Sequence, residues 1–376
     1  MNKSVCILRS NPVRPDSRVE KEAISLMKEG YKVNIFAWDR DSDYKPRKEE
    51  LVIGETKIPI VRTGIKASFG EGFKNIIAFL KFQLSMRKFL RRNKFDIIHA
   101  CDFDTAFFSY KLVLRKKEKF VFDIFDFVHS RPKNFFQKQV KKAQYDIIKK
   151  ADATIICTED RKNQIEGSEP KKLIVVHNTP SGNHVMENEC ESVNISGRIK
   201  VAYVGILQGS RLLEEIGLFF SKNHDVEFHI GGFGLLEEYF QELADNNDNI
   251  FFHGRLSYQE TLNLEKDCDI MLAIYDPKRS NHIYAAPNKF YESLYLGKPL
   301  LMVKGTGMST VLAEENIGEL IDYSYDGFEK GLRDLIDRKN EWSEISEKMK
   351  SLYTEKFSWE IMEKRLLDLY NNLSKV

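Results

Sequence analysis

Residues 286–303 carry residue types suited to binding a phosphate and a sugar hydroxyl together. Pro287 and Asn288 mark a turn, with Asn288 as the expected N-cap of a short helix that ends at Gly297. Backbone N–H groups at the start of a helix attract an anion. Glu292 lies about one turn into the helix, where a carboxylate repels phosphate but accepts hydrogen bonds from sugar hydroxyls. Phosphate and polyol together indicate a nucleotide, although the helix dipole alone also favours an acid there.

Glycines follow the strands expected upstream of this segment. The strands cover residues 200–205, 226–230, 250–253 and 270–274, and the glycines include Gly205, Gly232 and Gly234. Because a glycine lets the backbone approach a ligand closely, we expect these strand ends to line a site. Arg211, at the start of a helix, is the expected bidentate partner of a phosphate.

The first half of the chain predicts a parallel sheet of its own. A strand over 5–8, a helix over 19–28 and a strand over 31–38 form a β-loop-α-β unit, which places ligands at the carboxyl ends of the strands. The loop is not a G-x-G-x-x-G, so no dinucleotide fingerprint is present. Polar candidates follow this strand and two later ones: Asp16, Arg18, Asp102, Asp126 and His129. Asp16 and Arg18 are equally typical of a helix cap or a solvated loop.

Length and charge indicate two domains of opposite sign. The 376 residues are enough for two cores, and residues 1–180 hold 37 Lys and Arg against 23 Asp and Glu, a net charge of +14. The remainder carries −12. A basic half favours an anionic partner, such as a membrane surface or lipid phosphate, unless the two domains simply attract each other. We expect domains over 1–180 and 198–356, a polar linker over 181–197, and an amphipathic C-terminal helix over 357–376.

The expected membrane contact is a peripheral one. Residues 73–90 form a basic amphipathic helix with aromatics, which is typical of helices that lie on anionic membranes and also of ordinary surface helices. No apolar run approaches the roughly 20 residues of a membrane span, and the start of the chain has no signal-peptide pattern. The five cysteines have no CxxC spacing, so we expect neither disulfides nor zinc, and a cytoplasmic location. Nucleic acid is not an expected partner, because no recognition motif accompanies the charge.

Several segments, in their order and spacing, resemble the GT-B glycosyltransferases of the large retaining family 4. They include P-D-S-R-V-E-K-E-A and F-D-I-I-H-A-C-D in the first half, and Y-V-G-I-L, I-G-G-F-G and A-P-N-K-F-Y-E-S-L-Y-L-G-K-P-L in the second. The resemblance covers nearly the whole chain. It implies an α/β fold of two Rossmann-like domains with parallel sheets that face each other across a cleft. It also implies that the second domain binds the nucleotide sugar, that the first binds the acceptor, and that the last helix packs back on the first domain.

By position, the resemblance gives roles to several residues. It implies that Glu292 binds ribose, that Arg211 and Gly205 hold the diphosphate, and that His253 lies near the base. Four places depart from the family pattern. Ile206 stands where the family has an arginine, and Pro287, Asn288 and Lys289 stand where it has a glycine turn. Tyr284 stands where the family has its first acid, and Phe125 where it has a histidine, so Asp126 or His129 is expected to replace the latter.

The function implied is sugar transfer from a nucleoside diphosphate sugar of UDP or GDP type to a hydroxyl acceptor, with retention of configuration. Arg211, Lys289 and the helix-end amides of the stretch Pro287-Asn288-Lys289 would stabilise the leaving diphosphate without a metal. The nucleotide sugar is a co-substrate, so no cofactor is expected. Asp126 would position the acceptor hydroxyl. The acceptor implied is a glycan or lipid-linked glycan in cell-surface polysaccharide synthesis. The alternatives are an epimerase of the same architecture and a non-catalytic subunit that binds nucleotide sugars.

Overall fold

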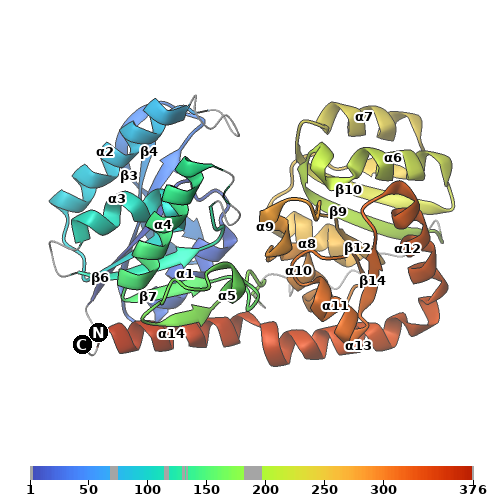
Figure 1. Ribbon diagram of the computed structural model, residues 1–376. Helices are drawn as coiled ribbons and strands as arrows, with labels where there is room; N and C mark the ends of the chain where they lie inside the picture. The colour runs from blue at the N-terminus through green and yellow to red at the C-terminus, as the bar shows by residue number, and fades with distance from the viewer. Residues whose placement is uncertain are drawn as a thin grey trace. The chain divides into compact units, whose positions relative to one another are not determined.

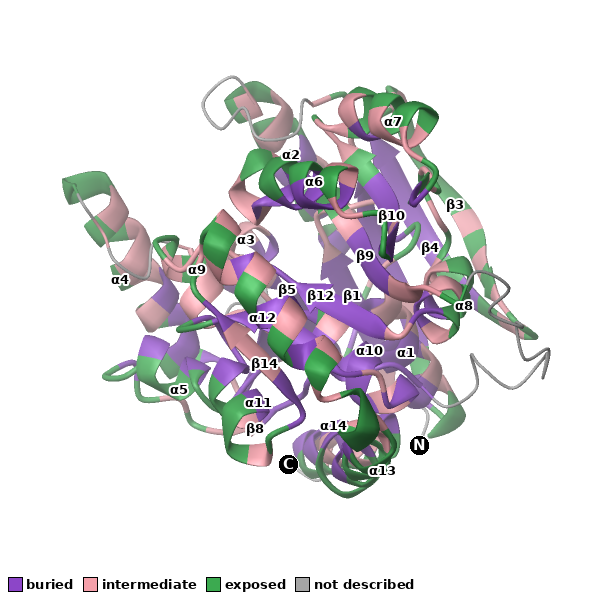
Figure 2. Cartoon of the chain, turned by 90° about the vertical axis from the view of Figure 1, so that its right-hand side faces the viewer, coloured by how far each residue is buried: buried purple, intermediate pink, exposed green. Residues whose placement is uncertain are grey.

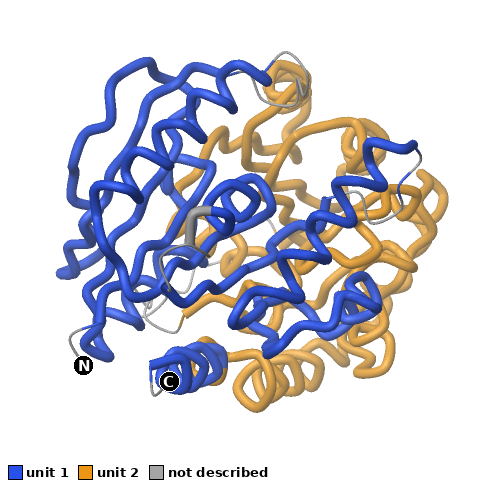
Figure 3. Tube along the Cα trace, turned by 60° about the vertical axis from the view of Figure 1, so that its left-hand side comes forward, with its two compact units in different colours: residues 1–177, 362–376 blue, residues 178–361 orange. Residues whose placement is uncertain are grey.

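The chain forms two compact units in the computed structural model (Figures 1 and 3). Unit 1 comprises residues 1–177 and 362–376, and unit 2 comprises residues 178–361. The structure describes residues 3–67, 75–113, 118–128, 132, 134–181 and 197–374. Most of the linker expected over 181–197, together with His129 and Cys190, lies outside these residues.

Unit 1 is built on an eight-stranded sheet in the order β3-β4-β2-β1-β5-β6-β7-β8. All neighbouring strands are parallel except β3, which pairs antiparallel with β4. The strands are β1 (Ser4–Arg9), β2 (Lys32–Asp39), β3 (Tyr44–Ile53), β4 (Thr56–Gly64), β5 (Ile97–Cys101), β6 (Lys119–Ile124), β7 (Ala153–Ile156) and β8 (Leu173–Val175).

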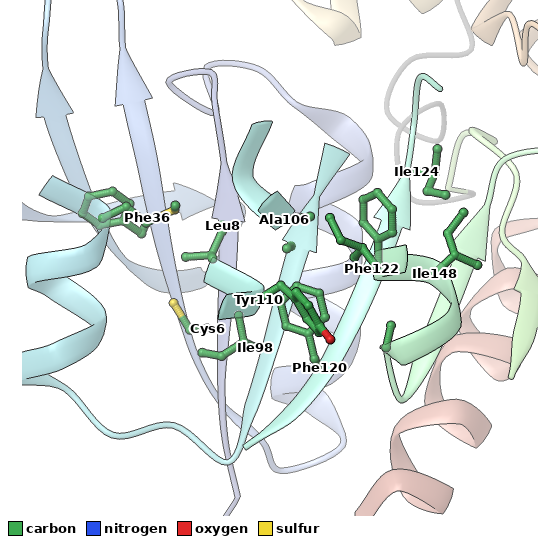
Figure 4. Close-up of a cluster of buried hydrophobic side chains, with 14 of the residues drawn as sticks. Cys6, Leu8, Phe36, Ile98, Ala106, Tyr110, Phe120, Phe122, Ile124 and Ile148 are labelled. Carbon is green, nitrogen blue, oxygen red and sulfur yellow. The ribbon is translucent and has the colours of Figure 1, made fainter. Parts of the chain in front are cut away.

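Helices cover both faces of this sheet. Side chains of α2 (Ile76–Arg92), α3 (Asp102–Val113) and α4 (Phe135–Lys150) pack on one face and share a core with the strands (Figure 4). The opposite face carries α1 (Ser17–Lys28) and the C-terminal helix α14 (Trp359–Ser374). On α14, Tyr370 is fully buried and contacts both Tyr31 and His99. The short α5 (Arg161–Gln164) follows β7.

Unit 2 holds a six-stranded sheet, all parallel, in the order β11-β10-β9-β12-β13-β14. Its strands are β9 (Ile199–Leu207), β10 (Val226–Gly234), β11 (Ile250–Phe252), β12 (Ile270–Ala273), β13 (Leu300–Val303) and β14 (Gly318–Ile321). Its helices are α6 (Leu213–Lys222), α7 (Glu237–Asn246), α8 (Tyr258–Asp267), α9 (Ser280–Ile283), α10 (Asn288–Leu296), α11 (Ser309–Glu315), α12 (Tyr325–Asp337) and α13 (Trp342–Leu352). Figure 2 shows that the strands of both sheets are mostly buried while the outer sides of the helices are exposed.

The predicted fold class is confirmed, with two local corrections. Residues 44–64 form a hairpin that the sequence pattern did not reveal, because β3 is largely exposed and lacks an apolar alternation. Pro287, not Asn288, is the N-cap of α10, and Asn288 is the first helical residue. Gly297 ends that helix in the left-handed conformation, with φ of 67°. Within the described residues, no helix is both long and apolar enough to cross a membrane.

Candidate functional site

Arg211 lies at the carboxyl edge of the unit 2 sheet. Strands β9 and β12 are adjacent and parallel, so the residues that follow them meet at this edge. The guanidinium carbon of Arg211, in the turn after β9, lies 3.7 Å from the ring centroid of Tyr275, which follows β12. Its Nη1 donates a hydrogen bond of 3.3 Å to the Ile274 carbonyl, whereas its buried Nε has no partner among the described residues. The aromatic ring and the carbonyl therefore fix the guanidinium, and one donor stays unsatisfied.

Lys289 reaches the same edge from the first turn of α10. Its ammonium group lies 4.8 Å from the ring centroid of Tyr203, and a Cβ added to Gly205 would come within 2.8 Å of it. Glycine at position 205 is therefore what allows the lysine to lie against the end of β9. Burial alone lowers the pKa of Lys289, but Tyr203, Tyr275 and Glu292 outweigh this and raise it above its ordinary value, so the side chain stays charged.

Two tyrosines, Tyr203 and Tyr275, thus orient the two cations, and the sequence reasoning missed both. The sequence does contain a signal for both tyrosines: Tyr203 lies two residues before Gly205, and Tyr275 comes just after a buried strand. Aromatic faces attract a cation by about 0.5–2 kcal/mol, which is weaker than a charge-assisted hydrogen bond to phosphate. The arrangement therefore positions both cations and leaves them able to bind an anion.

Glu292 lies in the same helix, with only 3% of its surface exposed. Its carboxylate hydrogen-bonds to the Tyr258 hydroxyl. Burial raises the pKa of Tyr258 well above its ordinary value, and the charge of Glu292 raises it further. Glu265 is also buried, and burial followed by the charge of Glu292 raises the pKa of Glu265 well above its ordinary value. The ribose contact expected of Glu292 stays a prediction, and a ligand hydroxyl would have to share this carboxylate with Tyr258.

The glycines of β10 have a structural reason that differs from the expected one. At Gly232, with φ of 136°, a Cβ would lie 1.8 Å from the Gly205 carbonyl oxygen, and at Gly234 it would lie 2.4 Å from that of Leu207. Both residues are therefore required for β10 to pair closely with β9, and neither needs a ligand to explain it. The side chain of His253 is exposed at the end of β11, where its Nε2 lies 3.2 Å from His229 Nδ1.

At the carboxyl edge of the unit 1 sheet, Asp102 fixes the loop that carries Asp126. Asp102 has a φ of 65°, and its Oδ1 accepts hydrogen bonds of 2.9 Å from the backbone N–H groups of Phe125 and Asp126. Its Oδ2 accepts from Arg9 Nη1 at 2.6 Å. Burial raises the pKa of Asp102 to about 7 although Arg9 opposes this. Asp102 therefore positions the loop, with one oxygen on the loop backbone and the other on Arg9, and the substrate contact expected of it stays a prediction.

Asp126 is exposed, with its carboxylate 3.3 Å from Arg161 Nη2. It is accessible to a hydroxyl acceptor, as the sequence prediction requires. The alternative candidate, His129, lies outside the described residues. The ring centroid of Phe125 lies 4.2 Å from the guanidinium carbon of Arg9 and 4.5 Å from that of Arg18.

Asp16 and Arg18 both have structural partners in unit 1, and the substrate contact expected of them stays a prediction. Asp16 is the N-cap of α1, and it also accepts a 2.7 Å hydrogen bond from Arg9 Nε. Arg18 is 4% exposed and donates to Asp123 at 2.7 Å, Glu22 at 3.0 Å and the Val176 carbonyl at 2.8 Å. The capping alternative therefore holds for Asp16, and Arg18 belongs to the interior of unit 1.

One cluster in the described residues has atoms spaced as metal ligands: His99, Cys101 and Asp123, all buried. These groups already have partners. His99 contacts the Tyr370 hydroxyl at 2.6 Å, and Asp123 is paired with the Arg18 guanidinium. A cation would have to displace that guanidinium, so the donor set is poorly suited to a metal.

The comparisons with known proteins agree with this architecture. Residues 18–179 match the family model Glycosyltransferase Family 4. Sucrose-phosphate synthase from Thermosynechococcus elongatus superposes with a TM-score of 0.77 at 12% identity, over 100% of both chains. Anabaena HepE, solved in complex with UDP and glucose, gives 0.71 at 11% identity, again over 100% of both chains. No curated protein sequence matches significantly.

An epimerase has the same architecture. UDP-GlcNAc 2-epimerase from Neisseria meningitidis, bound to UDP-GlcNAc, gives a TM-score of 0.62 at 14% identity, over 98% of this chain and 100% of that one. At such identities the structural matches show the fold alone, whereas the family model also indicates the chemistry. The predicted resemblance to GT-B glycosyltransferases of family 4 is thus supported by the family model over residues 18–179 and by the fold over the whole chain.

Proposed function

We propose that the protein transfers a sugar from a UDP- or GDP-type nucleotide sugar to a hydroxyl acceptor, with retention of configuration. The observation that carries the proposal is the pair of cations at the carboxyl edge of the unit 2 sheet. Arg211 and Lys289 are held by tyrosine rings beside Gly205, with the N-terminus of α10 at the same edge. A diphosphate is bound well by such an arrangement: two positive charges and the N-terminus of a helix at one edge, with a glycine that leaves room for the lysine beside the strand.

In the proposed reaction the bond between the anomeric carbon and the diphosphate oxygen breaks, and a bond to the acceptor oxygen forms. Arg211, Lys289 and the first amides of α10 stabilise the negative charge that develops on the leaving diphosphate. Asp126 positions the acceptor hydroxyl, whose proton passes to Asp126 or to a phosphate oxygen. Asp102 and Arg161 keep the Asp126 carboxylate in place through the loop backbone and an ion pair. No cofactor and no metal takes part in this proposal.

The acceptor that we propose is a glycan or lipid-linked glycan in cell-surface polysaccharide synthesis, met at the inner face of the membrane. The strongly basic first half of the chain supports this, because lipid-linked acceptors carry phosphate and lie on an anionic surface.

A donor screen followed by a turnover assay tests the proposal. A thermal-shift screen of UDP and GDP sugars should identify a stabilising donor, because a ligand that binds only the folded state stabilises it. With that donor, nucleoside diphosphate should be released only when an acceptor is added.

The same assay separates the alternatives. An epimerase would convert the donor sugar without any acceptor, which NMR of the donor detects. A non-catalytic subunit would bind the donor and release nothing with any acceptor. Either result would contradict the proposed transfer.

A further inference from the structure

Large apolar side chains are exposed on two helices of unit 1. On α2, Ile76, Ile77, Leu80 and Leu84 are 48–68% exposed, and on α4, Phe135 and Phe136 are 76% and 63% exposed. In the described part of unit 1 only Val52 is comparable. Exposure of a single apolar residue is ordinary, but six such residues on two helices of one layer indicate a contact surface.

The topology places these six residues at one edge of the unit. Helix α2 joins β4 to β5, and α4 joins β6 to β7, all within the parallel part of the sheet. Both helices therefore begin at the carboxyl edge, and the exposed apolar residues occupy the first half of α2 and the first two positions of α4. Helix α3 packs between them in the shared layer (Figure 1). This is also the edge at which Asp126 is exposed.

The same two helices are strongly basic. Together α2 and α4 contain ten Lys and Arg residues and a single acid, Asp146. On α2 the exposed cations share one side of the helix with the apolar residues and follow them along it: Arg87, Lys88, Arg91 and Arg92. On α4, Lys138, Lys142 and Lys149 border a shallow hollow of about 440 Å³, which is also lined by Asp146 and by Glu169, the ion-pair partner of Lys149 at 2.6 Å.

We propose that this face, formed by the exposed residues of α2 and α4 and here called the α2–α4 face, docks unit 1 onto an anionic lipid bilayer. The apolar side chains at the starts of both helices enter the interface, and the Lys and Arg residues contact lipid phosphates. The docked edge is then the one that presents Asp126, so an acceptor anchored in the same membrane reaches it without leaving the surface. This last step deepens the proposed function and rests on it, whereas the docking itself does not.

The composition of the face favours a bilayer over other partners. A nucleic acid would use the cations but would leave Ile77, Leu84 and both phenylalanines exposed to water. A bilayer accommodates both kinds of side chain, because its headgroups are anionic and its acyl boundary is apolar. A second copy of this chain that docked through the same face would carry the same charge and would be repelled.

Co-sedimentation of the full-length protein with vesicles tests the docking. The protein should bind vesicles of equal parts phosphatidylcholine and phosphatidylglycerol at low salt, bind pure phosphatidylcholine vesicles weakly, and be released by high salt. The double variants Phe135→Ser/Phe136→Ser and Lys138→Glu/Lys142→Glu should each weaken binding about tenfold or more. As matched controls outside this face, Val52→Ser and Lys222→Glu/Lys330→Glu should bind as the unchanged protein does.

Other results would overturn the docking. If the unchanged protein stays in solution with anionic vesicles, or if the control variants lose binding equally, the α2–α4 face is not a membrane surface. Size-exclusion chromatography with light scattering tests the remaining alternative, a second copy of the chain. A dimer that Phe135→Ser/Phe136→Ser converts to monomer would identify the face as a subunit interface instead.

A parallel assay keeps the two proposals apart. Donor binding by thermal shift and nucleoside diphosphate release with a soluble acceptor need no vesicle, so both should be unchanged in the face variants. Vesicle binding without any transfer would contradict the proposed function and leave the docking intact. Transfer without vesicle binding would contradict the docking and leave the proposed function intact.

Discussion

At the scale of single residues, the candidate donor site depends on how its cations are held. Neither Arg211 nor Lys289 forms an ion pair in the described part of the chain, and each lies over a tyrosine ring instead. A carboxylate partner would compete with a phosphate for the same N–H groups, whereas a ring face does not. The site therefore has positioned charge that is still available to a ligand.

Replacing Lys289 by Met should weaken binding of a nucleoside diphosphate by about 10- to 100-fold, the usual value of one charge-assisted hydrogen bond. Binding of the nucleoside alone should change by less than about threefold, because the lost contact is to phosphate. Calorimetric titration with UDP or GDP and with the matching nucleoside measures both. Lys304→Met is the control, since Lys304 is an exposed lysine of the same unit that pairs with Asp322. Equal losses for diphosphate and nucleoside would argue against a phosphate role.

A second group of residues forms a buried charged network in unit 1. His99 bridges the Tyr370 hydroxyl and Asp123, at 2.6 and 3.2 Å, and Arg18 pairs with Asp123 and Glu22. Burial and the charge of Asp123 raise the pKa of Glu22 from 4.5 to about 7. For Asp123, the contacts with Arg18 and His99 outweigh burial and lower the pKa. Of the two carboxyls that pair with Arg18, Glu22 is thus the one that keeps its proton up to about pH 7.

The raised pKa of Glu22 predicts a pH effect on stability. Between about pH 4.5 and about pH 7 the folded state binds this proton more tightly than the unfolded state, so the stabilisation is present at low pH and is lost as the pH rises through this window. Glu22→Gln keeps the hydrogen bond to Arg18 and removes the titration. Urea unfolding at about pH 5 and about pH 8 should therefore show a flatter pH dependence for this variant, by on the order of a few kcal/mol at most.

Glu238→Gln, a change at an exposed acid of α7, is the control and should leave the pH dependence as it is. If Glu22→Gln has the same pH slope as the unchanged protein, Glu22 is ionised throughout and the assignment of the proton is wrong.

At the scale of elements, the sequence predicted what local patterns determine. The helix and strand of residues 288–303 were found because Pro287, Gly297 and Pro299 delimit them. The hairpin of β3 and β4 was missed because its outer strand is polar. The roles of Tyr203 and Tyr275 could not be predicted, because they depend on contacts between β9, β12 and α10 that only the folded sheet creates. For the same reason Arg18 looked like a loop residue although it is buried.

The glycines at the ends of β10 and β11 give a prediction at this scale. Gly232→Ala should destabilise unit 2 by about 3 kcal/mol or more, because its Cβ would collide with the Gly205 carbonyl and its φ is also unfavourable. Gly254→Ala should cost only about 1 kcal/mol, since a Cβ there meets nothing within 4 Å and only the left-handed φ of 62° is penalised. Urea unfolding of the two variants measures the difference. Similar costs at both positions would show that the close pairing of β9 and β10 is not what requires Gly232.

At the scale of the whole molecule, each unit has its own core. The buried cluster that includes Phe36, Phe82 and Phe122 lies within unit 1, while the clusters around Phe228 and Phe290 lie within unit 2. The chain enters unit 2 at Asn178 and returns to unit 1 at Met362, inside α14. The stability of unit 1 therefore depends on the last residues of the sequence as well as on the first.

This organisation predicts two separable unfolding transitions in scanning calorimetry. Leu366→Ala, in the buried side of α14, should lower the transition of unit 1 by the cost of a core cavity, about 2–5 kcal/mol, and leave the other transition in place. Leu301→Ala, in the core of unit 2, is the matched change and should lower the transition of unit 2 while leaving that of unit 1 in place.

UDP or GDP, at about 100 times its dissociation constant, should stabilise only the transition that Leu301→Ala lowers, by about 2.7 kcal/mol. A single transition that both substitutions and the nucleotide move together would mean that the units unfold as one. A nucleotide that raises the transition lowered by Leu366→Ala would place the donor site in unit 1, against the assignment to Arg211 and Lys289.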